Sequence, residues 1–481
     1  MRDAGGSRNG WWLASFVGCT LLSFTSAAAE PAKENTAPAL AADVPVARAI
    51  TLDDALAYAR AHQPAIQAAL ARVQTEEANA KVPRAEWLPS IGATAQIFGA
   101  TANNTTAMYL IPDGIALPRI GGSAAVSPAQ ATWKPYASTI VGASVFQELF
   151  DFGRIAASAA AADAQVEIRK HGSDAERLDI ELGVEEAYFA VFAAKGVLIA
   201  SEEAYERTKA HRDLAKAGVG SGLRSPIELT RAEADLSRYD IGRIRARGSL
   251  LVAQSVLAAS MGAPELSLDV SGVPPPPAAL PSLARSIETA AARDPMLLIA
   301  LARLKAQEKT TTAIGAKLRP NLFATGTLSG RAGGGPPSGD GPVPAGNGFL
   351  PDVPNWDVGL VLSWSLFDGV VFAQHRASRA EEEVRKDEVA VYREQEVAAV
   401  ENAYVKVGVA NDALPALKSA VDGAVANYAQ ADARFRAGLG NAVELADAEA
   451  LRTDANVQLA LGLFEAARAR AVFGRTIAEG L

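Results

Sequence analysis

The chain has 481 residues, 49% of them hydrophobic, and a formal net charge of −8. This length and hydrophobic content are enough for two or three ordinary domains and argue against disorder. Lysine and arginine form no cluster beyond short helical runs, so we expect no phosphate-binding surface and no nucleic acid partner.

The N-terminal residues are typical of a secretory signal. Two arginines precede an apolar stretch over residues 11–24, and three alanines at 27–29 provide a small-residue cleavage site. We therefore assign residues 1–29 to a signal peptide and residues 30–49 to a tether rich in proline and alanine. The mature chain is expected to leave the cytoplasm, and no later window offers about 18 consecutive apolar residues for a spanning helix.

Cys19 is the only cysteine, which excludes an intramolecular disulfide. The preceding Phe16, Val17 and Gly18 loosely resemble a bacterial lipoprotein signal, in which the cysteine becomes the acylated first residue. However, the apolar region continues past the cysteine over residues 20–24, and phenylalanine stands where leucine is usual. Two alternatives therefore stay open: Cys19 is lipidated, or it is lost with the signal peptide.

Two helices are predicted after the tether. An amphipathic segment starts at Thr51 and breaks at Pro64, with Asp53 and Asp54 in the first turn, where a helix dipole favours acidic side chains. Pro64 fits the first turn of a new helix, and apolar or small residues then continue to Trp87. We expect a short helix followed by a longer one.

Runs with a period of two predict four strands. Two lie at about 90–100 and 136–147, joined by a loop rich in asparagine, proline and glycine, and two more lie at about 321–329 and 356–366. Strands of about ten residues are long enough to cross a bilayer at a tilt.

The chain repeats itself. Pro64 matches Pro295 and Pro89 matches Pro320 at one offset, since 295−64 and 320−89 both equal 231. A repeat of this length indicates duplication of a whole structural half. We therefore expect two internal repeats.

The boundaries of these repeats follow from the pattern. The first repeat is assigned to residues 50–265 and the second to residues 282–481, with a proline-rich linker at 266–281. Each repeat contains one long helical hairpin, predicted at 151–262 and at 369–479.

Regular spacing predicts how the long helices pack. The second hairpin has an apolar or aromatic residue every seven positions, which predicts a supercoiled seam: Val400, Val407, Leu414, Val421, Tyr428 and Phe435. The first hairpin has a shorter series: Val184, Val191, Leu198 and Tyr205. Pro415 lies inside the second series, and because an interior proline removes a backbone hydrogen bond, we expect a kink or break there.

Each hairpin turns at a glycine-rich segment, AGVGSG in the first repeat and AGLGN in the second. Gly218 and Gly438 are expected to end the long helices in the left-handed conformation. These glycines are 220 positions apart, whereas Glu233 and Glu449 are 216 apart, so we expect four extra residues in the first turn and tips that differ.

No catalytic constellation is recognisable. Asp151 and Asp368 each follow a strand and open a helix, so we interpret them as N-caps that accept backbone N–H bonds. The four histidines show no ligand spacing relative to one another or to Cys19, and neither a nucleotide fingerprint nor a nucleophile elbow is present. We predict no enzyme, metal site or cofactor.

Four strands cannot form a membrane barrel alone. An open sheet leaves edge N–H and C=O groups unpaired in hydrocarbon, at several kcal/mol per group. Closure needs at least eight strands, so several chains must pool theirs. Helices far longer than a membrane is thick would continue from that barrel as a tube, which predicts a conduit.

The series of elements resembles the TolC family of bacterial outer-membrane channels over about residues 50–480. The resemblance depends on the WLPS and LRPN strand starts at 87–90 and 318–321, the FDFG and FDG strand ends at 150–153 and 367–369, and the two hairpin turns. It implies an α+β membrane protein in the outer membrane, a homotrimer with a twelve-stranded barrel, four strands per chain, that continues into a periplasmic coiled-coil barrel.

The resemblance also implies where a partner binds. In TolC-like channels the hairpin ends form the periplasmic entrance and meet the helical hairpin of an adaptor protein. By motif position this implies contacts at Gly218, Val219, Gly220, Ser221, Gly438, Leu439, Gly440 and Asn441. Acidic side chains often restrict this entrance in the family, and the sequence assigns no gate among Glu228, Glu444 and Asp447.

Our leading hypothesis is a passive exit duct for small toxic compounds. Its partners would be a periplasmic adaptor, an inner-membrane pump of the RND, ABC or MFS type, and outer-membrane lipid. One alternative is the outer-membrane component of type I protein secretion, and another, of a different class, is a soluble periplasmic coiled-coil scaffold. The sequence names neither the exported compound nor the pump.

Overall fold

The computed structural model describes residues 48–101, 135–271, 279–333 and 353–480. All of them belong to one compact unit, Val46–Leu481. The expected signal peptide, Cys19, most of the tether and both long loops between paired strands lie outside the described residues.

Four strands form one antiparallel sheet in the order β2-β3-β5-β6. Their bounds are β2 (Ser90–Thr101), β3 (Pro135–Phe150), β5 (Asn321–Gly333) and β6 (Val353–Ser363). Both central strands extend further than the sequence predicted, and β6 lies three residues earlier. It includes Pro354, which an edge strand tolerates because one side of its ladder needs no N–H donor.

The sheet has one apolar face and one polar face. Ile91 pairs with Val145, Val145 with Gly326, and Gly326 with Val358, so one row of the apolar face crosses all four strands. The exposed large side chains of this face are Ile91, Ile97, Val141, Val145, Leu328, Trp356, Val358, Leu360 and Leu362. The opposite face is mostly polar, with Thr94, Gln96, Ser144, Thr325 and Thr327, but it also carries the contacting rings of Phe146 and Phe323. The side chains follow the predicted period of two, and the apolar face is of the kind that membrane strands present to lipid.

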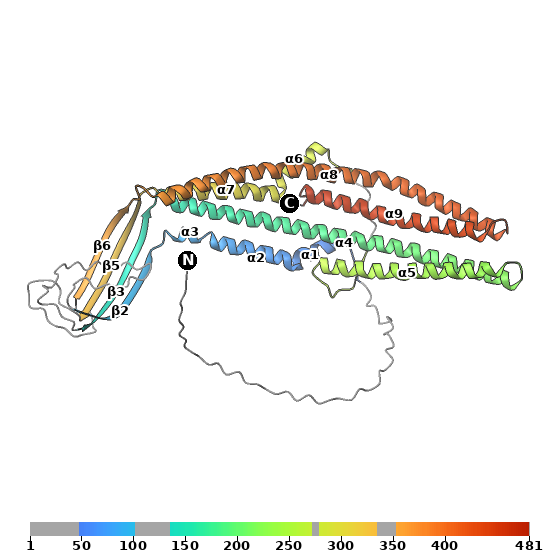
Figure 1. Cartoon of the computed structure of the whole chain (residues 1–481), viewed down its shortest axis with the longest axis horizontal. Helices are drawn as coiled ribbons and strands as arrows, with labels where there is room; N and C mark the ends of the chain where they lie inside the picture. Colours follow the sequence, from blue (N-terminus) through green and yellow to red (C-terminus); the bar gives the residue numbers. More distant parts are fainter. Residues whose placement is uncertain (1–47, 102–134, 272–278, 334–352, 481) are drawn as a thin grey trace, which may run out of the picture. The chain divides into compact units, whose positions relative to one another are not determined.

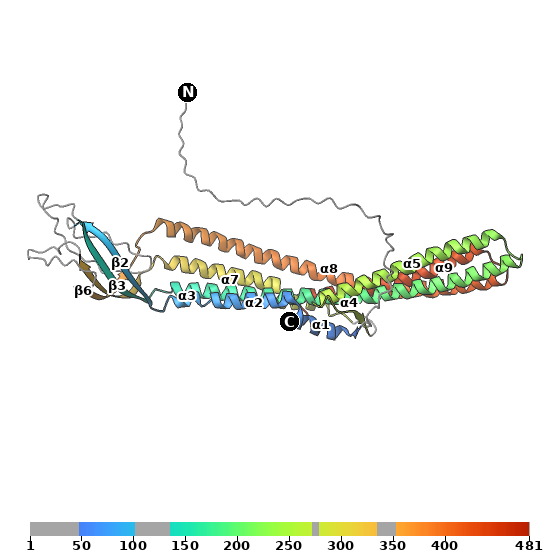
Figure 2. The same ribbon diagram turned by 90° about the horizontal axis from the view of Figure 1, so that it is seen from below.

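Nine helices occupy the described residues (Figure 1). They are α1 (Leu52–His62), α2 (Pro64–Asn79), α3 (Val82–Ala85), α4 (Arg154–Gly220), α5 (Pro226–Ser260), α6 (Leu283–Arg293), α7 (Pro295–Ala316), α8 (Gly369–Arg436) and α9 (Ala442–Thr476). Prolines start α2 and α7, and the hydroxyls of Thr51 and Ser282 cap α1 and α6. Figure 2 shows α5 and α9 returning alongside α4 and α8 as two hairpins.

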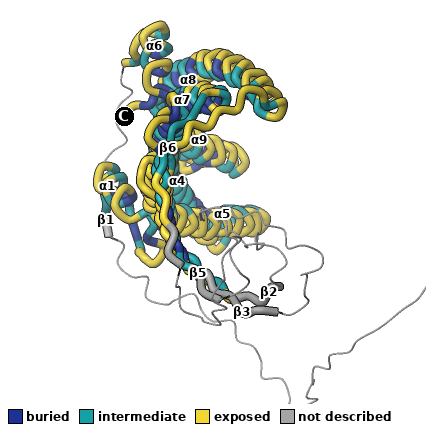
Figure 3. The backbone as a smooth tube through the Cα atoms, turned by 90° about the vertical axis from the view of Figure 1, so that its left-hand side faces the viewer, coloured by how far each residue is buried: buried dark blue, intermediate teal, exposed yellow. Residues whose placement is uncertain are grey.

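The helices pack in the same order as the strands. Near the hairpin turns, α5 packs on α4, α4 on α9 and α9 on α8; nearer the sheet, α2 packs on α4, α4 on α7 and α7 on α8. Figure 3, a view along the helices, shows α4 and α9 between α5 and α8. Because β3 leads into α4, α7 into β5 and β6 into α8, the helices continue the sheet. The outer helices of this layer are α2 and α8 nearer the sheet, and α5 and α8 nearer the hairpin turns.

The series with a spacing of seven is the packing seam of α8. Val400, Val407, Leu414, Tyr428 and Phe435 are buried, and Val421 is half-buried. Of the kink or break predicted at Pro415, the break is absent, because α8 continues through this residue without interruption. Its neighbour Leu414 is buried in the seam, so packing holds the helix together where one backbone bond is missing.

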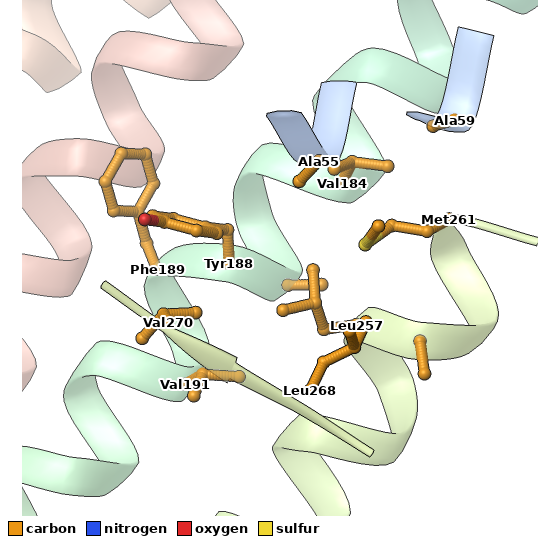
Figure 4. Packing of buried hydrophobic residues seen from close by; sticks show 12 residues of the cluster. Ala55, Ala59, Val184, Tyr188, Phe189, Val191, Leu257, Met261, Leu268 and Val270 are labelled. Carbon is orange, nitrogen blue, oxygen red and sulfur yellow. The ribbon is translucent and has the colours of Figure 1, made fainter. Parts of the chain in front are cut away.

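A small parallel pair of strands was not predicted. β1 (Arg48–Ile50) lies at the end of the expected tether, and β4 (Leu268–Val270) lies in the expected linker. Strands of three residues are too short to show a period. They are held by the cluster in Figure 4, where Leu268 and Val270 pack with Val184, Val191 and Leu257.

Tertiary hydrogen bonds also fix this pair. Tyr188 of α4 donates to the Ser271 carbonyl at 2.6 Å. Lys195 of α4 donates to Asp269 of β4 at 2.7 Å. The chain before the first repeat is therefore anchored to the middle of the longest helix of that repeat.

Gly196 allows the two hairpins to approach each other. A Cβ atom there would lie 2.9 Å from the Cβ of Ala460, so α4 and α9 would have to separate. We expect Gly196→Ala to destabilise the protein by about 1–3 kcal/mol, the usual cost of overpacking, and to lower the melting temperature measured by circular dichroism.

Gly172→Ala is the matched control on the same helix, because a Cβ there meets nothing within 4 Å. It should stabilise α4 by about 0.5–1 kcal/mol through helix propensity alone. Equal melting temperatures for the two variants would contradict a close packing role for Gly196.

Candidate functional site

The two hairpin turns have the same conformation, contrary to our expectation. Gly222 and Gly438 both have a φ of +74° and follow the C-cap residues Ser221 and Ala437. The prediction for Gly438 is confirmed, but the one for Gly218 was wrong, because Gly218 lies inside α4 and Gly222 ends the helix. These two turn glycines are 216 positions apart, since 438−222 equals 216, so the first turn has no extra residues.

Backbone hydrogen bonds show the same equivalence. Leu223 N–H donates to the Gly218 carbonyl at 2.9 Å, and Leu439 N–H donates to the Arg434 carbonyl at 2.9 Å. This bond from the second residue after the C-cap closes a Schellman motif in each turn. By sequence, AGVG at 217–220 resembles AGLG at 437–440. In the structure, the segment equivalent to AGLG is instead SGLR at 221–224.

Glycine and arginine exchange places between the two turns. The first turn has Gly218 and Arg224 where the second has Arg434 and Gly440. A Cβ at Gly218 would lie 2.6 Å from Cδ of Arg224, and a Cβ at Gly440 would lie 3.2 Å from Cβ of Arg434. Each turn therefore has room for one long side chain at this contact. Close approach, rather than helix termination, explains both glycines.

The other predicted tip residues surround these turns. Val219 and Gly220 end α4, and the Ser221 hydroxyl donates to the Gly218 carbonyl at 3.1 Å. Asn441 caps α9 by accepting the Glu444 N–H at 2.8 Å. Leu439 is 76% exposed at the tip.

An apolar surface that the sequence did not predict is repeated at the two tips. Leu223 is 84% exposed and corresponds to Leu439, and exposed Ile227 corresponds to exposed Val443. We call these four side chains the apolar tip. The shared offset of 216 would have revealed it. Large exposed apolar side chains gathered at the ends of two adjacent helical hairpins are typical of a binding surface.

An arginine joins the first tip to the second hairpin. The guanidinium of Arg224 lies 4.0 Å from the ring centroid of Phe435 and donates to the Phe435 carbonyl at 3.4 Å. Arg224 also pairs with Glu228 at 3.2 Å, and Arg434 pairs with Glu444 at 3.1 Å. Two of the three acids considered as gate residues are therefore paired within their own tips.

A buried ion pair connects the hairpins further from the turns. Arg207 of α4 donates to Glu449 of α9 at 2.9 Å from Nε and 3.0 Å from Nη2. Glu449 is 2% exposed and also accepts from Thr453 at 3.0 Å. Arg207 has a second partner in Glu203 at 3.0 Å.

Beside this pair, His211 of α4 meets Tyr428 of α8, with 2.8 Å between Nε2 and the phenol oxygen. Burial lowers the pKa of His211 and raises the pKa of Tyr428 to about 12. Both side chains are therefore neutral at pH 7, and the phenol donates to the imidazole. The guanidinium of Arg452 lies 5.0 Å from the Tyr428 ring centroid.

A hollow that is open to solvent lies next to these contacts. Its walls come from all four helices of the two hairpins: α4 supplies Thr208 and His211, α5 supplies Tyr239, α8 supplies Phe435 and α9 supplies Leu445. The hairpins are therefore in contact through specific side chains but are not packed tightly along their whole length.

The two helices that follow strands β3 and β6 have different N-caps. Asp368 is the N-cap of α8 and accepts from Val370 at 2.9 Å and Val371 at 3.1 Å. The N-cap of α4 is Gly153, so assigning that position to Asp151 was wrong, although the buried Asp151 carboxylate accepts the Gly153 N–H at 2.9 Å and also the Ile155 N–H.

In the part of the chain that the structure describes, no three histidine, cysteine or acidic side chains form a group suited to a metal ion. Within the same residues, none of the helices has both the length and the apolar character needed to cross a membrane.

Comparison with known families identifies the chain. Residues 55–263 and 286–472 match the family model described as outer membrane efflux protein. The chain belongs to this family. No curated protein matches the chain. Its general role is therefore efflux at the bacterial outer membrane, with a large helical part in the periplasm, and its relatives are channels rather than enzymes.

Solved structures of TolC-family channels share the fold. The outer-membrane channel OprN is 20% identical, with a TM-score of 0.68 over 89% of this chain and 90% of OprN. VceC from Vibrio cholerae is 16% identical, with a TM-score of 0.68 over 89% of this chain and 96% of VceC. The open state of MtrE from Neisseria gonorrhoeae is 18% identical, with a TM-score of 0.67 over 89% of each chain. The resemblance to the TolC family is confirmed.

Proposed function

We propose that this efflux protein is the outer-membrane exit duct of a tripartite system that exports small toxic compounds. An inner-membrane pump of the RND, ABC or MFS type would deliver the compound, and a periplasmic adaptor would dock on the hairpin turns. The observation that carries this proposal is the apolar tip, which repeats one exposed surface at the ends of both hairpins.

Unpartnered lateral edges support a homotrimer. On α5, exposed apolar side chains lie within one face: Ile241, Ile244, Leu251, Val252 and Val256. On α8, exposed valines are spaced by seven, fourteen and four positions along one face: Val384, Val391, Val405 and Val409. Since α5 and α8 lie at opposite edges, the α5 face of one copy can pack on the α8 face of the next, which closes a ring of identical chains.

The sheet supports the same closure. β2 and β6 each have a ladder partner on one side only among the described residues. Unpaired edge groups are costly in lipid, and four strands are too few to close, so three copies would form a barrel of twelve. The apolar face would contact lipid and the threonine-rich face would line the lumen. A soluble scaffold would leave this apolar face without a role.

An adaptor would meet the turns at the residues proposed from the family pattern and at the apolar tip. Replacing both Leu223 and Leu439 by aspartate should abolish export, because an adaptor surface complementary to leucine cannot bury an unpaired carboxylate without a cost of several kcal/mol. The variant should still trimerise and conduct ions in planar bilayers, since the tips lie far from the sheet. Accumulation of a fluorescent efflux substrate in cells measures export.

Replacing Ser225 by aspartate is the control for added charge near the tip. This residue is the N-cap of α5, where aspartate caps equally well, so a negative charge is added without loss of an apolar side chain. Export should persist in this control. A leucine variant that exports normally would contradict the proposed docking surface, and purified trimers that never conduct would contradict the duct itself.

A further inference from the structure

Asp294 occupies a corner of the second repeat, where α6 ends and α7 begins. It is 4% exposed, and one carboxylate oxygen, Oδ2, accepts the Leu297 N–H at 3.0 Å as the N-cap of α7. Its backbone carbonyl accepts the Leu298 N–H at 3.1 Å. Both hydrogen bonds hold the start of α7 in place.

A second carboxylate faces this corner from α8. Glu396 is half-buried and lies one helical turn before Val400, which shares an apolar cluster with Ala290, one helical turn before Asp294. Its Oε1 is buried and has no protein donor among the described residues. Two carboxylates can make a hydrogen bond only if one of them carries a proton.

Positive charge at this site is limited. Arg475 of α9 faces the pair, with its Nη1 3.8 Å from Asp294 Oδ1. The same guanidinium donates from Nε to Asp179 of α4 at 2.5 Å. The charge of Arg475 is therefore shared between Asp294 and Asp179.

The surroundings make a second negative charge costly. Beside the corner lies an apolar cluster that includes Ala290 of α6, Val400 and Val407 of α8 and Phe473 of α9. Low polarity strengthens the repulsion between two adjacent carboxylates and weakens the solvation of each.

We propose that Asp294 and Glu396 share one proton and form a pH-sensitive clasp between the α6–α7 corner and α8. When the proton is held, the two carboxyl groups are joined by a hydrogen bond. When it is lost, they repel each other, and the start of α7 loosens from α8. No atom other than this proton is gained or lost.

The direction of the pH effect follows from the environment. Burial first, and then Asp294, raises the pKa of Glu396 to about 7. A carboxyl with a raised folded-state pKa contributes stability that is fully present at acidic pH and is lost as the pH rises through the folded pKa. The clasp is therefore closed at pH 5.5 and open at pH 8.5.

A local measurement is needed because another carboxyl responds in the same range. Burial and Glu181 raise the pKa of Glu185 on α4 to about 7, so the melting temperature of the whole protein would report both sites. Hydrogen exchange of the Leu297 and Leu298 amides reports the corner alone. Exchange should be measured on the full-length protein in detergent at pH 5.5 and 8.5 and divided by the intrinsic rate at each pH.

In the unmodified protein, we expect the protection of these two amides to fall roughly tenfold between pH 5.5 and 8.5, the equivalent of one pKa unit. Glu396→Gln should give the same protection at both pH values, because the side-chain amide of glutamine mimics the protonated carboxyl. Glu401→Gln, at an exposed position of the same helix, should behave like the unmodified protein.

Asp294→Asn is the second variant, because asparagine also caps helices well and removes the shared charge. In Asp294→Asn, the protection of the Leu297 and Leu298 amides should also become independent of pH. An equal loss of protection in the unmodified protein and both variants would overturn the proposal, as would an unmodified protein whose protection does not change with pH.

Discussion

Replacing Ile244 by aspartate should leave the protein monomeric and without channel activity. Ile244 is 58% exposed and lies near the centre of the apolar face of α5. In a trimer this position would be buried three times, once at each interface, and each unpaired carboxylate would cost several kcal/mol. A penalty repeated in every interface is large compared with the stability of ordinary assemblies.

The oligomeric state of this variant can be measured in detergent by size-exclusion chromatography with light scattering, and channel activity in planar bilayers. Thr312→Asp is the control for added charge, since Thr312 is an exposed polar residue of α7, a different helix from the one that carries the apolar face. The control should trimerise and conduct. A trimeric Ile244→Asp variant would exclude the α5 face as a subunit interface.

Features with local periodicity could be predicted from the sequence. The series from Val400 to Phe435 marks the buried seam because every seventh residue of a long helix returns to the same face. Alternation around Ile91 likewise marks the apolar face of the sheet. Pro64 and Pro295 indicated the helix starts because proline is accepted at that position.

Features that depend on long-range contacts could not be predicted. The turn register was misassigned because Gly218 resembles a helix-ending glycine in sequence, whereas its role is to make room for Arg224 six positions later. Strands β1 and β4 are fixed by Tyr188 of α4 rather than by their own pattern. The ion pair of Arg207 joins residues 242 positions apart. None of these contacts leaves a local signal.

The second large effect is expected at that ion pair. Glu449→Ala would leave the guanidinium of Arg207, with only 18% of the side chain exposed, without its bidentate partner. Removing one member of a buried pair typically costs about 3–5 kcal/mol. We expect the lower end of this range, because Glu203 keeps one contact with Arg207. The free energy of unfolding from urea titration at pH 7 measures this loss.

A double-mutant cycle separates the interaction from the loss of packing. Arg207→Ala should destabilise at least as much as Glu449→Ala, because it leaves a carboxylate whose side chain is 3% exposed with Thr453 as its remaining donor. The free energy of unfolding of the double variant should fall by less than the sum of the losses in the two single variants, since the double variant leaves neither charge unpaired.

The exposed pair of Arg434 and Glu444 at the second tip is the matched control. Its side chains are 57% and 43% exposed, so a double-mutant cycle on this pair should give a coupling energy of roughly 0–1 kcal/mol. Strictly additive losses at Arg207 and Glu449 would mean that this ion pair contributes no interaction energy between the hairpins. A coupling well above that of the exposed pair would instead show that this buried contact, between α4 of one repeat and α9 of the other, stabilises the association of the two hairpins.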